Sequence, residues 1–161
     1  MKRPVNIALL CGAAAVILSC IIMLNLLKND TTMEILTGTY GGKIYRYSFD
    51  TESLEFTLLE KVGAENASYA IKDAGNIYAV SETGDASGAY SFSVGSQTAM
   101  TADKRQTGAD PCFIMKYDDR ILTADYSGGS VTVFPLIEGS LGDSIQKLDF
   151  QGNGPVEGRQ E

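Results

Sequence analysis

The sequence has 161 residues, of which 44% are hydrophobic and 20% are charged, an ordinary composition for one globular domain. Its net charge of −7 and its pI of about 4.6 argue against a nucleic-acid partner, which would require a basic stripe. The chain contains no histidine, so the commonest general base and metal ligand is missing. Its three cysteines have no zinc-ligand spacing, and we expect no metal site.

The first 30 residues have the pattern of an export or membrane segment. Lys2 and Arg3 precede an apolar run over 5–27, which exceeds the ~20 residues that a membrane-spanning helix needs. The tetrapeptide ending at Cys20 also resembles a bacterial lipobox, whose cysteine becomes lipidated. An uncleaved helical anchor and a cleaved or lipoprotein signal both place the folded part in the periplasm or cell envelope. The third alternative is a cytoplasmic protein that begins near Met33, and mass spectrometry of the mature N-terminus separates the three.

From residue 33 onward the chain repeats itself about every 43 residues. Segments 35–40, 77–82 and 121–126 are similar to one another, and they follow at offsets of 42 and 44 residues. Each segment leads into a glycine-containing turn and a second β-like run. A period of about 40 to 50 residues that is made of short strands predicts an all-β fold of β-propeller blades, each with four antiparallel strands.

The strand and turn pattern divides the chain into about two and three-quarter blades. We expect a first blade at 33–62 without its inner strand, a second at 66–106, a third at 110–151, and the start of the next blade's loop at 152–161. A closed propeller needs at least about four blades. The chain is therefore expected either to be a piece of a longer protein or to close by self-association of its open blade edges, which light scattering would reveal. The expected strands are 33–39, 43–49, 54–62, 68–72, 76–81, 89–94, 99–105, 112–116, 120–124, 131–136 and 144–150.

Several candidate residues fall in loops that share one predicted rim of the propeller. Glu82 and Asp125 end equivalent strands there, and they are either acid/base carboxylates or, more simply, solvated turn residues. Asn66 and Asp110 precede inner strands at equivalent positions, where such side chains often bond their own backbone. Cys112 lies in an apolar run and is expected to be buried. The loops of this rim are 40–42, 63–67, 81–88, 107–111, 125–130 and the tail 152–161.

Several motifs, in order along the chain, resemble the lactonase family of seven-bladed propellers, named after a bacterial 6-phosphogluconolactonase. They are Thr37-Gly38-Thr39-Tyr40, Asp110-Pro111-Cys112, the segment 124–136, Gly139-Ser140-Leu141-Gly142, and the tail Gly152-Asn153-Gly154-Pro155 with Arg159-Gln160-Glu161. The resemblance covers about residues 33 to 161. It implies hydrolysis of a small-molecule sugar lactone, typically 6-phosphogluconolactone of the pentose phosphate route, without a metal or other cofactor.

The same resemblance places the family's catalytic histidine, in a Pro-His-x-His run, directly after Glu161. We therefore expect the 161-residue chain alone to be inactive. Arg159 and Gln160 carry over as substrate-binding candidates, and Arg159 suits a phosphate or carboxylate. Tyr126 and Glu82 join them through their places on the predicted rim.

Two departures from the family pattern bear on the substrate, and one alternative function remains open. The family usually has Asn where Asp125 stands and Pro where Ala67 stands, and an export segment is unusual for a cytoplasmic pentose phosphate enzyme. The alternative is a non-catalytic cell-surface propeller that binds a ligand or protein across the same rim. A Pro-His-x-His stretch encoded downstream would favour the enzyme.

Overall fold

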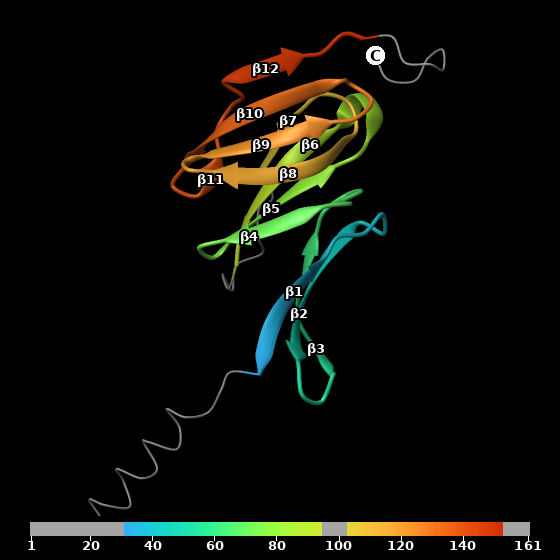
Figure 1. The fold of residues 1–161 in the computed structure, drawn as a ribbon, viewed down its shortest axis with the longest axis vertical. Coiled ribbons are helices and arrows are strands. Elements are labelled where there is room, and N and C mark those ends of the chain that lie inside the picture. The colour runs from blue at the N-terminus through green and yellow to red at the C-terminus, as the bar shows by residue number, and fades with distance from the viewer. Residues whose placement is uncertain (1–30, 95–102, 153–161) are drawn as a thin grey trace, which may run out of the picture.

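The computed structural model describes residues 31–94 and 103–152, which form strands and one short 3₁₀ turn. Figure 1 shows three antiparallel sheets that follow one another along the chain, with the first and third at opposite ends. The predicted all-β class is confirmed for these residues. The predicted N-terminal helix and Cys20 lie outside the described residues. Within the described ranges, no helix is long and apolar enough to cross a membrane.

The first sheet contains three strands joined by two hairpins. They are β1 (Thr32–Thr37), β2 (Lys43–Asp50) and β3 (Phe56–Gly63), in the spatial order β1-β2-β3. Strand β3 begins two residues later than predicted because Leu54 has a φ of 60°, a left-handed conformation that belongs to the turn. Alternation along β2 directs Ile44 into the core, whereas Tyr45 and Tyr47 lie on the opposite face.

The second sheet contains four strands whose spatial order equals their chain order, because each connection is a hairpin. A single 3₁₀ turn, η1 (Gly84–Ala86), lies between its second and third strands. The fourth strand, predicted over 99–105, is observed from Asp103 onward, and residues 95–102 lie outside the described ranges. The strands are β4 (Ala70–Asp73), β5 (Asn76–Ser81), β6 (Gly88–Ser93) and β7 (Asp103–Gln106).

The third sheet differs from the prediction at its outer edge. The strand expected over 144–150 is observed as β12 (Gln146–Asp149), and a further short strand, β11 (Ser140–Leu141), precedes it. Both pair with β10 (Ser130–Ile137), at opposite ends of that strand. Strand β11 follows a tight turn: Glu138 and Gly139 have φ values of 50° and 82°, which fold the chain back directly after Ile137. The strands are β8 (Pro111–Tyr117), β9 (Arg120–Asp125), β10 (Ser130–Ile137), β11 (Ser140–Leu141) and β12 (Gln146–Asp149).

The core consists of two hydrophobic clusters, one on each side of the second sheet. Alternate residues of β5 serve different clusters: Ile77 and Ala79 pack toward the first sheet, while Tyr78 and Val80 pack toward the third. All four side chains are buried, which explains why this strand is a continuous apolar run in the sequence. Phe134 of β10 is fully buried in the cluster between the second and third sheets.

Equivalent lysines on β4 and β8 link each sheet to the preceding one. The Nζ atom of Lys72 lies 2.6 Å from the Glu34 carboxylate on β1, and that of Lys116 lies 2.9 Å from the Asp73 carboxylate at the end of β4. The two lysines are 44 residues apart, which is the repeat length. Glu34 also accepts a hydrogen bond at 3.2 Å from Arg46 on β2, so this carboxylate joins three strands.

Substitution of Glu34 by Gln is expected to destabilise the protein by about 0.5–1 kcal/mol at neutral pH, as for partly exposed ion pairs. Desolvation of Glu34 alone would raise its pKa, but the hydrogen bonds and charges of Lys72 and Arg46 outweigh it and lower the pKa below the ordinary value. The stabilisation is therefore present above the unfolded-state pKa and is lost as the pH falls through the lowered folded-state pKa. Urea unfolding of wild type and E34Q at several pH values measures the difference in unfolding free energy. A difference that stays constant down to pH 3 would contradict the proposed role of the Glu34 charge.

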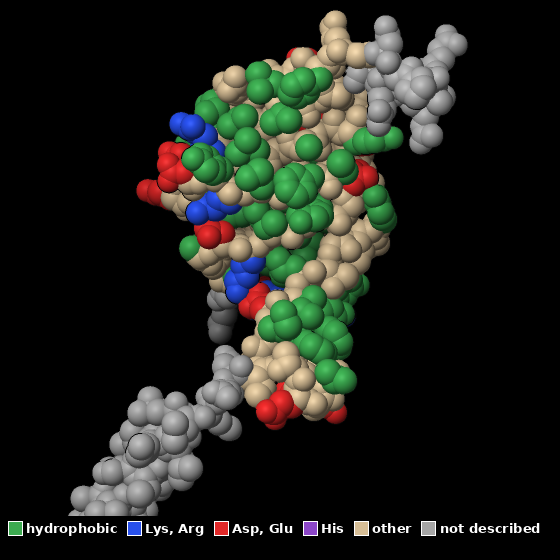
Figure 2. All heavy atoms as spheres, in the orientation of Figure 1, with side chains coloured by type: hydrophobic (Ala, Val, Ile, Leu, Met, Phe, Trp, Pro, Cys, Tyr) green, Lys and Arg blue, Asp and Glu red, His purple; other side chains and the backbone are tan. Residues whose placement is uncertain are grey.

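The outward faces of the first and third sheets expose apolar side chains. Met33 and Phe56 of the first sheet are more than half exposed, and Met115 and Leu148 of the third are about 40% exposed. Figure 2 shows hydrophobic side chains gathered over β8 to β10 and continuing toward the first sheet. Contiguous apolar surface of this kind normally marks a contact with another element or chain.

Candidate functional site

The rim loops 40–42, 63–67, 81–88, 107–111 and 125–130 lie on one side of the molecule, at the right of Figure 1, as predicted, while most of the tail 152–161 falls outside the described residues. Hydrogen bonds join each described loop to the next, through the backbone in most cases and through the Asp110 and Ser87 side chains between loops 81–88 and 107–111. The β3–β4 loop contacts both neighbours, because the Ala64 amide bonds the Gly42 carbonyl and the Glu82 amide bonds the Asn66 carbonyl. The Tyr126 amide makes the corresponding bond, at 2.9 Å, to the carbonyl of Asp110. The rim is therefore one hydrogen-bonded layer of loops.

Asn66 and Asp110 do not bond their own backbone as predicted. The Asn66 side chain donates to the Glu82 carbonyl at 2.9 Å, and the Asp110 carboxylate accepts from the Gly84 amide at 2.8 Å. Their φ values of 47° and 48° explain the difference, because this left-handed conformation turns each side chain toward a neighbouring loop. Hydrogen bonds from the Ser127 side chain and the Gly84 amide also lower the pKa of Asp110.

Glu82 forms a cluster with Tyr40 and Ser68 that joins three loops. Its Oε2 atom accepts a hydrogen bond of 2.8 Å from the Tyr40 hydroxyl, and its Oε1 atom accepts one from the Ser68 hydroxyl. The bond to the carboxylate, together with desolvation and the negative charge, raises the pKa of Tyr40. Tyr40 is 65% exposed, so the cluster is accessible from solvent. Sequence reasoning selected Glu82 but missed both partners, although the 42-residue offset from Tyr40 to Glu82 was a usable signal.

Asp125 was expected to be a solvated turn residue, and this prediction is wrong. The residue is 2% exposed. Its Oδ1 atom accepts from the Thr123 hydroxyl at 2.8 Å, and its Oδ2 atom accepts from the hydroxyls of Ser130 at 2.8 Å and Thr132 at 2.7 Å. Oδ2 also accepts from the Gly108 amide at 3.0 Å. A carboxylate that accepts four hydrogen bonds in the interior acts as a structural anchor for the β7–β8 loop.

The other predicted substrate-binding residues are only partly placed by the structure. Tyr126 lies at the start of the β9–β10 loop on the rim and is 59% exposed. Arg159 and Gln160 lie outside the described residues. The chain that leads to them leaves the third sheet at the rim, because the Phe150 amide bonds the Gly129 carbonyl of the β9–β10 loop at 2.8 Å.

Cys112 is exposed, contrary to the prediction that it is buried. The reason is a β-bulge at the start of β8: Pro111 pairs with Asp125 and Phe113 pairs with Ala124, which leaves Cys112 without a partner residue. Its Sγ atom lies 3.8 Å from the Ala124 carbonyl oxygen. No basic group that could activate the thiol contacts it among the described residues.

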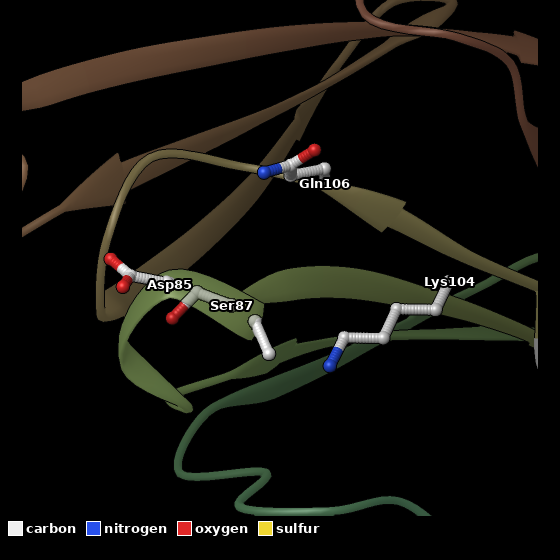
Figure 3. Close-up of a pocket in the computed structure, with 5 residues that line it drawn as sticks. Asp85, Ser87, Lys104 and Gln106 are labelled. Carbon is white, nitrogen blue, oxygen red and sulfur yellow. The ribbon is translucent and has the colours of Figure 1, made fainter.

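A cavity of about 330 Å³ lies between η1 and β7 at the outer part of the second sheet (Figure 3). The Lys104 ammonium lies 3.4 Å from the Thr83 hydroxyl and 5.3 Å from the centre of the Tyr90 ring. The Ser87 hydroxyl oxygen already accepts two backbone amide bonds. Figure 3 shows the labelled side chains pointing in different directions, so they do not form a convergent site. The lining residues are Asp85, Ala86, Ser87, Lys104 and Gln106.

The described part of the rim offers hydrogen-bonding groups rather than a reactive centre. Within residues 31–94 and 103–152, no group of three or more potential ligands is placed to hold a metal ion. The partly exposed Glu82 carboxylate already accepts bonds from a phenol and a hydroxyl. Such an arrangement can bind and orient hydroxyl groups of a ligand, as binding sites do with a few well-placed polar groups.

A family model and a relative of known name match most of the chain. Residues 34–161 match a family model described as "Lactonase, 7-bladed beta-propeller". The chain is 32% identical, over 139 residues, to the 6-phosphogluconolactonase of Bacillus subtilis (strain 168), covering 77% of this chain and 39% of that protein.

Solved structures agree with this match. A Bacteroides fragilis protein provisionally named a 6-phosphogluconolactonase has a TM-score of 0.74 and 33% identity, covering 83% of this chain and 40% of the other. A second protein with the same provisional name, from Bacteroides uniformis, has a TM-score of 0.74 and 30% identity, covering 81% of this chain and 41% of the other. A Lactobacillus plantarum protein with a TM-score of 0.65 and 24% identity shares the fold. The chain spans about two-fifths of the length of these relatives, and it belongs to the lactonase family of seven-bladed β-propellers.

Proposed function

We propose that the whole natural protein hydrolyses a sugar lactone, such as 6-phosphogluconolactone, at the rim formed by these loops. The match of the family model to residues 34–161 carries the proposal. The 6-phosphogluconolactonase of Bacillus subtilis supports the substrate class, because it is 32% identical to this chain. A sugar lactone is a cyclic ester with several hydroxyl groups, which suits a rim of polar side chains.

In the proposed reaction a water molecule attacks the lactone carbonyl and loses a proton to a general base, and the bond from the carbonyl carbon to the ring oxygen then breaks as that oxygen takes up the proton and becomes a hydroxyl group. Neither Asp125 nor Glu82 suits the role of base. Asp125 is buried beneath four hydrogen bonds, and both Glu82 oxygens already accept one. We propose that the base lies outside the described residues, and we assign this chain the task of binding and orienting the substrate.

Within that division of labour, we propose Arg159, Gln160, Tyr126 and Glu82 as substrate contacts. The rim position of Tyr126 and the departure of the chain toward 153–161 at the β9–β10 loop support this choice. Arg159 would hold the anionic substituent, since a guanidinium binds phosphate or carboxylate through two parallel hydrogen bonds. Tyr126 and Glu82 would contact the uncharged part of the ring.

A pH-stat assay tests the proposal, because lactone hydrolysis releases a carboxylic acid. The whole natural protein is expected to hydrolyse 6-phosphogluconolactone well above the spontaneous rate, while the 161-residue chain alone shows no activity above that rate. The R159Q variant is expected to raise KM about tenfold or more, from loss of a charge-assisted contact. A whole protein that binds the lactone without hydrolysing it would instead support a non-catalytic binding propeller, and turnover by the 161-residue chain would contradict the proposed division of labour.

A further inference from the structure

We propose that Tyr40, Glu82, Ser68 and Tyr69 form a subsite that recognises the hydroxyl groups of a polyhydroxylated ring and leaves the anionic substituent of the ligand on the opposite side. The inference rests on the proposed lactone hydrolysis for the identity of the ring. It adds residues from the first two sheets to the site, and it assigns them a role in substrate selection rather than in bond breaking.

The hydrogen bonds within the cluster determine which groups remain available to a ligand. Tyr40 and Ser68 both lie in hydrogen-bonding positions to donate to Glu82, and their two hydroxyls also hydrogen-bond each other. A hydroxyl oxygen has two lone pairs, so each oxygen still has at least one with which to accept from a ligand. A carboxylate also has about four acceptor sites, of which two are occupied. The cluster therefore presents acceptors only, and its natural complement is a set of ligand hydroxyl donors.

The positions of the three residues make the cluster a stable platform. Tyr40 belongs to the β1–β2 loop, Ser68 precedes β4, and Glu82 follows β5. The backbone around Glu82 is held by the Asn66 side chain and by the Asn66 carbonyl. Polar groups that are fixed in this way before binding lose little conformational entropy when a ligand arrives.

Charge determines which end of a sugar acid can lie here. Within the described residues, no salt bridge neutralises Glu82, whose recorded side-chain partners are the uncharged Tyr40 and Ser68 hydroxyls. A phosphate or carboxylate placed against this carboxylate would be repelled and would lose its hydration without compensation. The neutral hydroxyl-bearing part of the ligand is therefore the part that fits.

We assign the apolar half of the subsite to a partly exposed aromatic pair that includes the residue after Ser68 in the chain. Tyr69 follows Ser68 in the chain, and its ring lies 5.3 Å from that of Phe113, the equivalent residue in the third sheet. The two residues are 42% and 41% exposed. Their surface can pack against the C–H groups of a sugar ring while the cluster accepts its hydroxyl donors.

The test compares two uncharged lactones in the whole natural protein: glucono-1,5-lactone, which carries hydroxyls, and δ-valerolactone, which carries none. The Y40F and E82Q variants are expected to raise KM for gluconolactone about tenfold, the equivalent of one or two hydrogen bonds, and to change KM for δ-valerolactone much less. The matched control is Y117F, because Tyr117 is 69% exposed and lies in the β8–β9 hairpin, away from the rim. The Y117F variant should leave the KM for both lactones unchanged.

Two results would overturn the inference: an unchanged KM for gluconolactone in both variants, or equal losses with both lactones, which would indicate a structural role. If the wild-type protein hydrolyses neither of these lactones nor 6-phosphogluconolactone, the proposed function fails, and a binding measurement tests the subsite separately. Saturation-transfer NMR with glucitol then supports the subsite if the wild-type signal disappears in E82Q but persists in Y117F. Absence of any wild-type signal, or equal signals in wild type and E82Q, overturns it.

Discussion

Replacement of Asp125 by alanine is expected to lower the free energy of unfolding by about 3–5 kcal/mol, the range for breaking a buried charged network. The carboxylate is 2% exposed and accepts four hydrogen bonds. Its removal leaves the hydroxyls of Thr123, Ser130 and Thr132 without this acceptor in the interior, whereas the Gly108 amide keeps a longer bond of 3.3 Å to the Thr132 hydroxyl oxygen. Each buried group that loses its partner costs about 1–3 kcal/mol unless it can rotate to another.

The D125N variant provides the matched comparison, and we expect it to cost only about 1–2 kcal/mol. Asparagine preserves the shape and keeps one acceptor oxygen, and the Thr132 or Ser130 hydroxyl can rotate to accept from its amide. Urea unfolding followed by tyrosine fluorescence measures both variants, since the chain contains no tryptophan. Equal losses for D125A and D125N would show that the negative charge, rather than the hydrogen-bond network, is what the fold requires.

Gly38→Ala is the second substitution with a large expected effect, a loss of about 3 kcal/mol, the upper part of the range for overpacking. A Cβ atom at Gly38 would lie 2.2 Å from the carbonyl oxygen and 3.2 Å from the carbonyl carbon of Ala67. Both atoms belong to the backbone, so no side-chain rotation relieves the clash. The loop after β1 would have to move away from the start of β4, which separates the first and second sheets.

Gly41→Ala is the control in the same loop, because a Cβ atom there would meet only the Thr39 hydroxyl, at 3.5 Å. We expect its effect on the unfolding free energy to stay within about 0.5 kcal/mol, as for ordinary surface substitutions. Thermal and urea unfolding of both variants measure the two losses in unfolding free energy. A G38A protein as stable as G41A would mean that the two sheets are not in close contact at this point.

The repeats and strand positions were predictable because they depend on local patterns, namely alternation, turn residues and a fixed period. The details of the site depend on contacts between repeats, which one sequence does not reveal. Asp125 is the last residue of β9 and Glu82 directly follows the equivalent strand β5, yet Asp125 is buried by hydroxyls of β9 and β10 whereas Glu82 lies partly exposed beside Tyr40. Cys112 is exposed through a bulge. A bulge changes which side of a strand each residue occupies, and composition does not determine where it forms.

The paired lysines give the stack of sheets a direction. Lys72 on β4 reaches Glu34 in the first sheet, and Lys116 on β8 reaches Asp73 in the second. In both cases the cation belongs to the later sheet and the anion to the earlier one. During synthesis from the N-terminus, each repeat therefore leaves the ribosome when its ionic partner is already present in the chain, and no repeat has to wait for a later one to neutralise its inner-strand lysine.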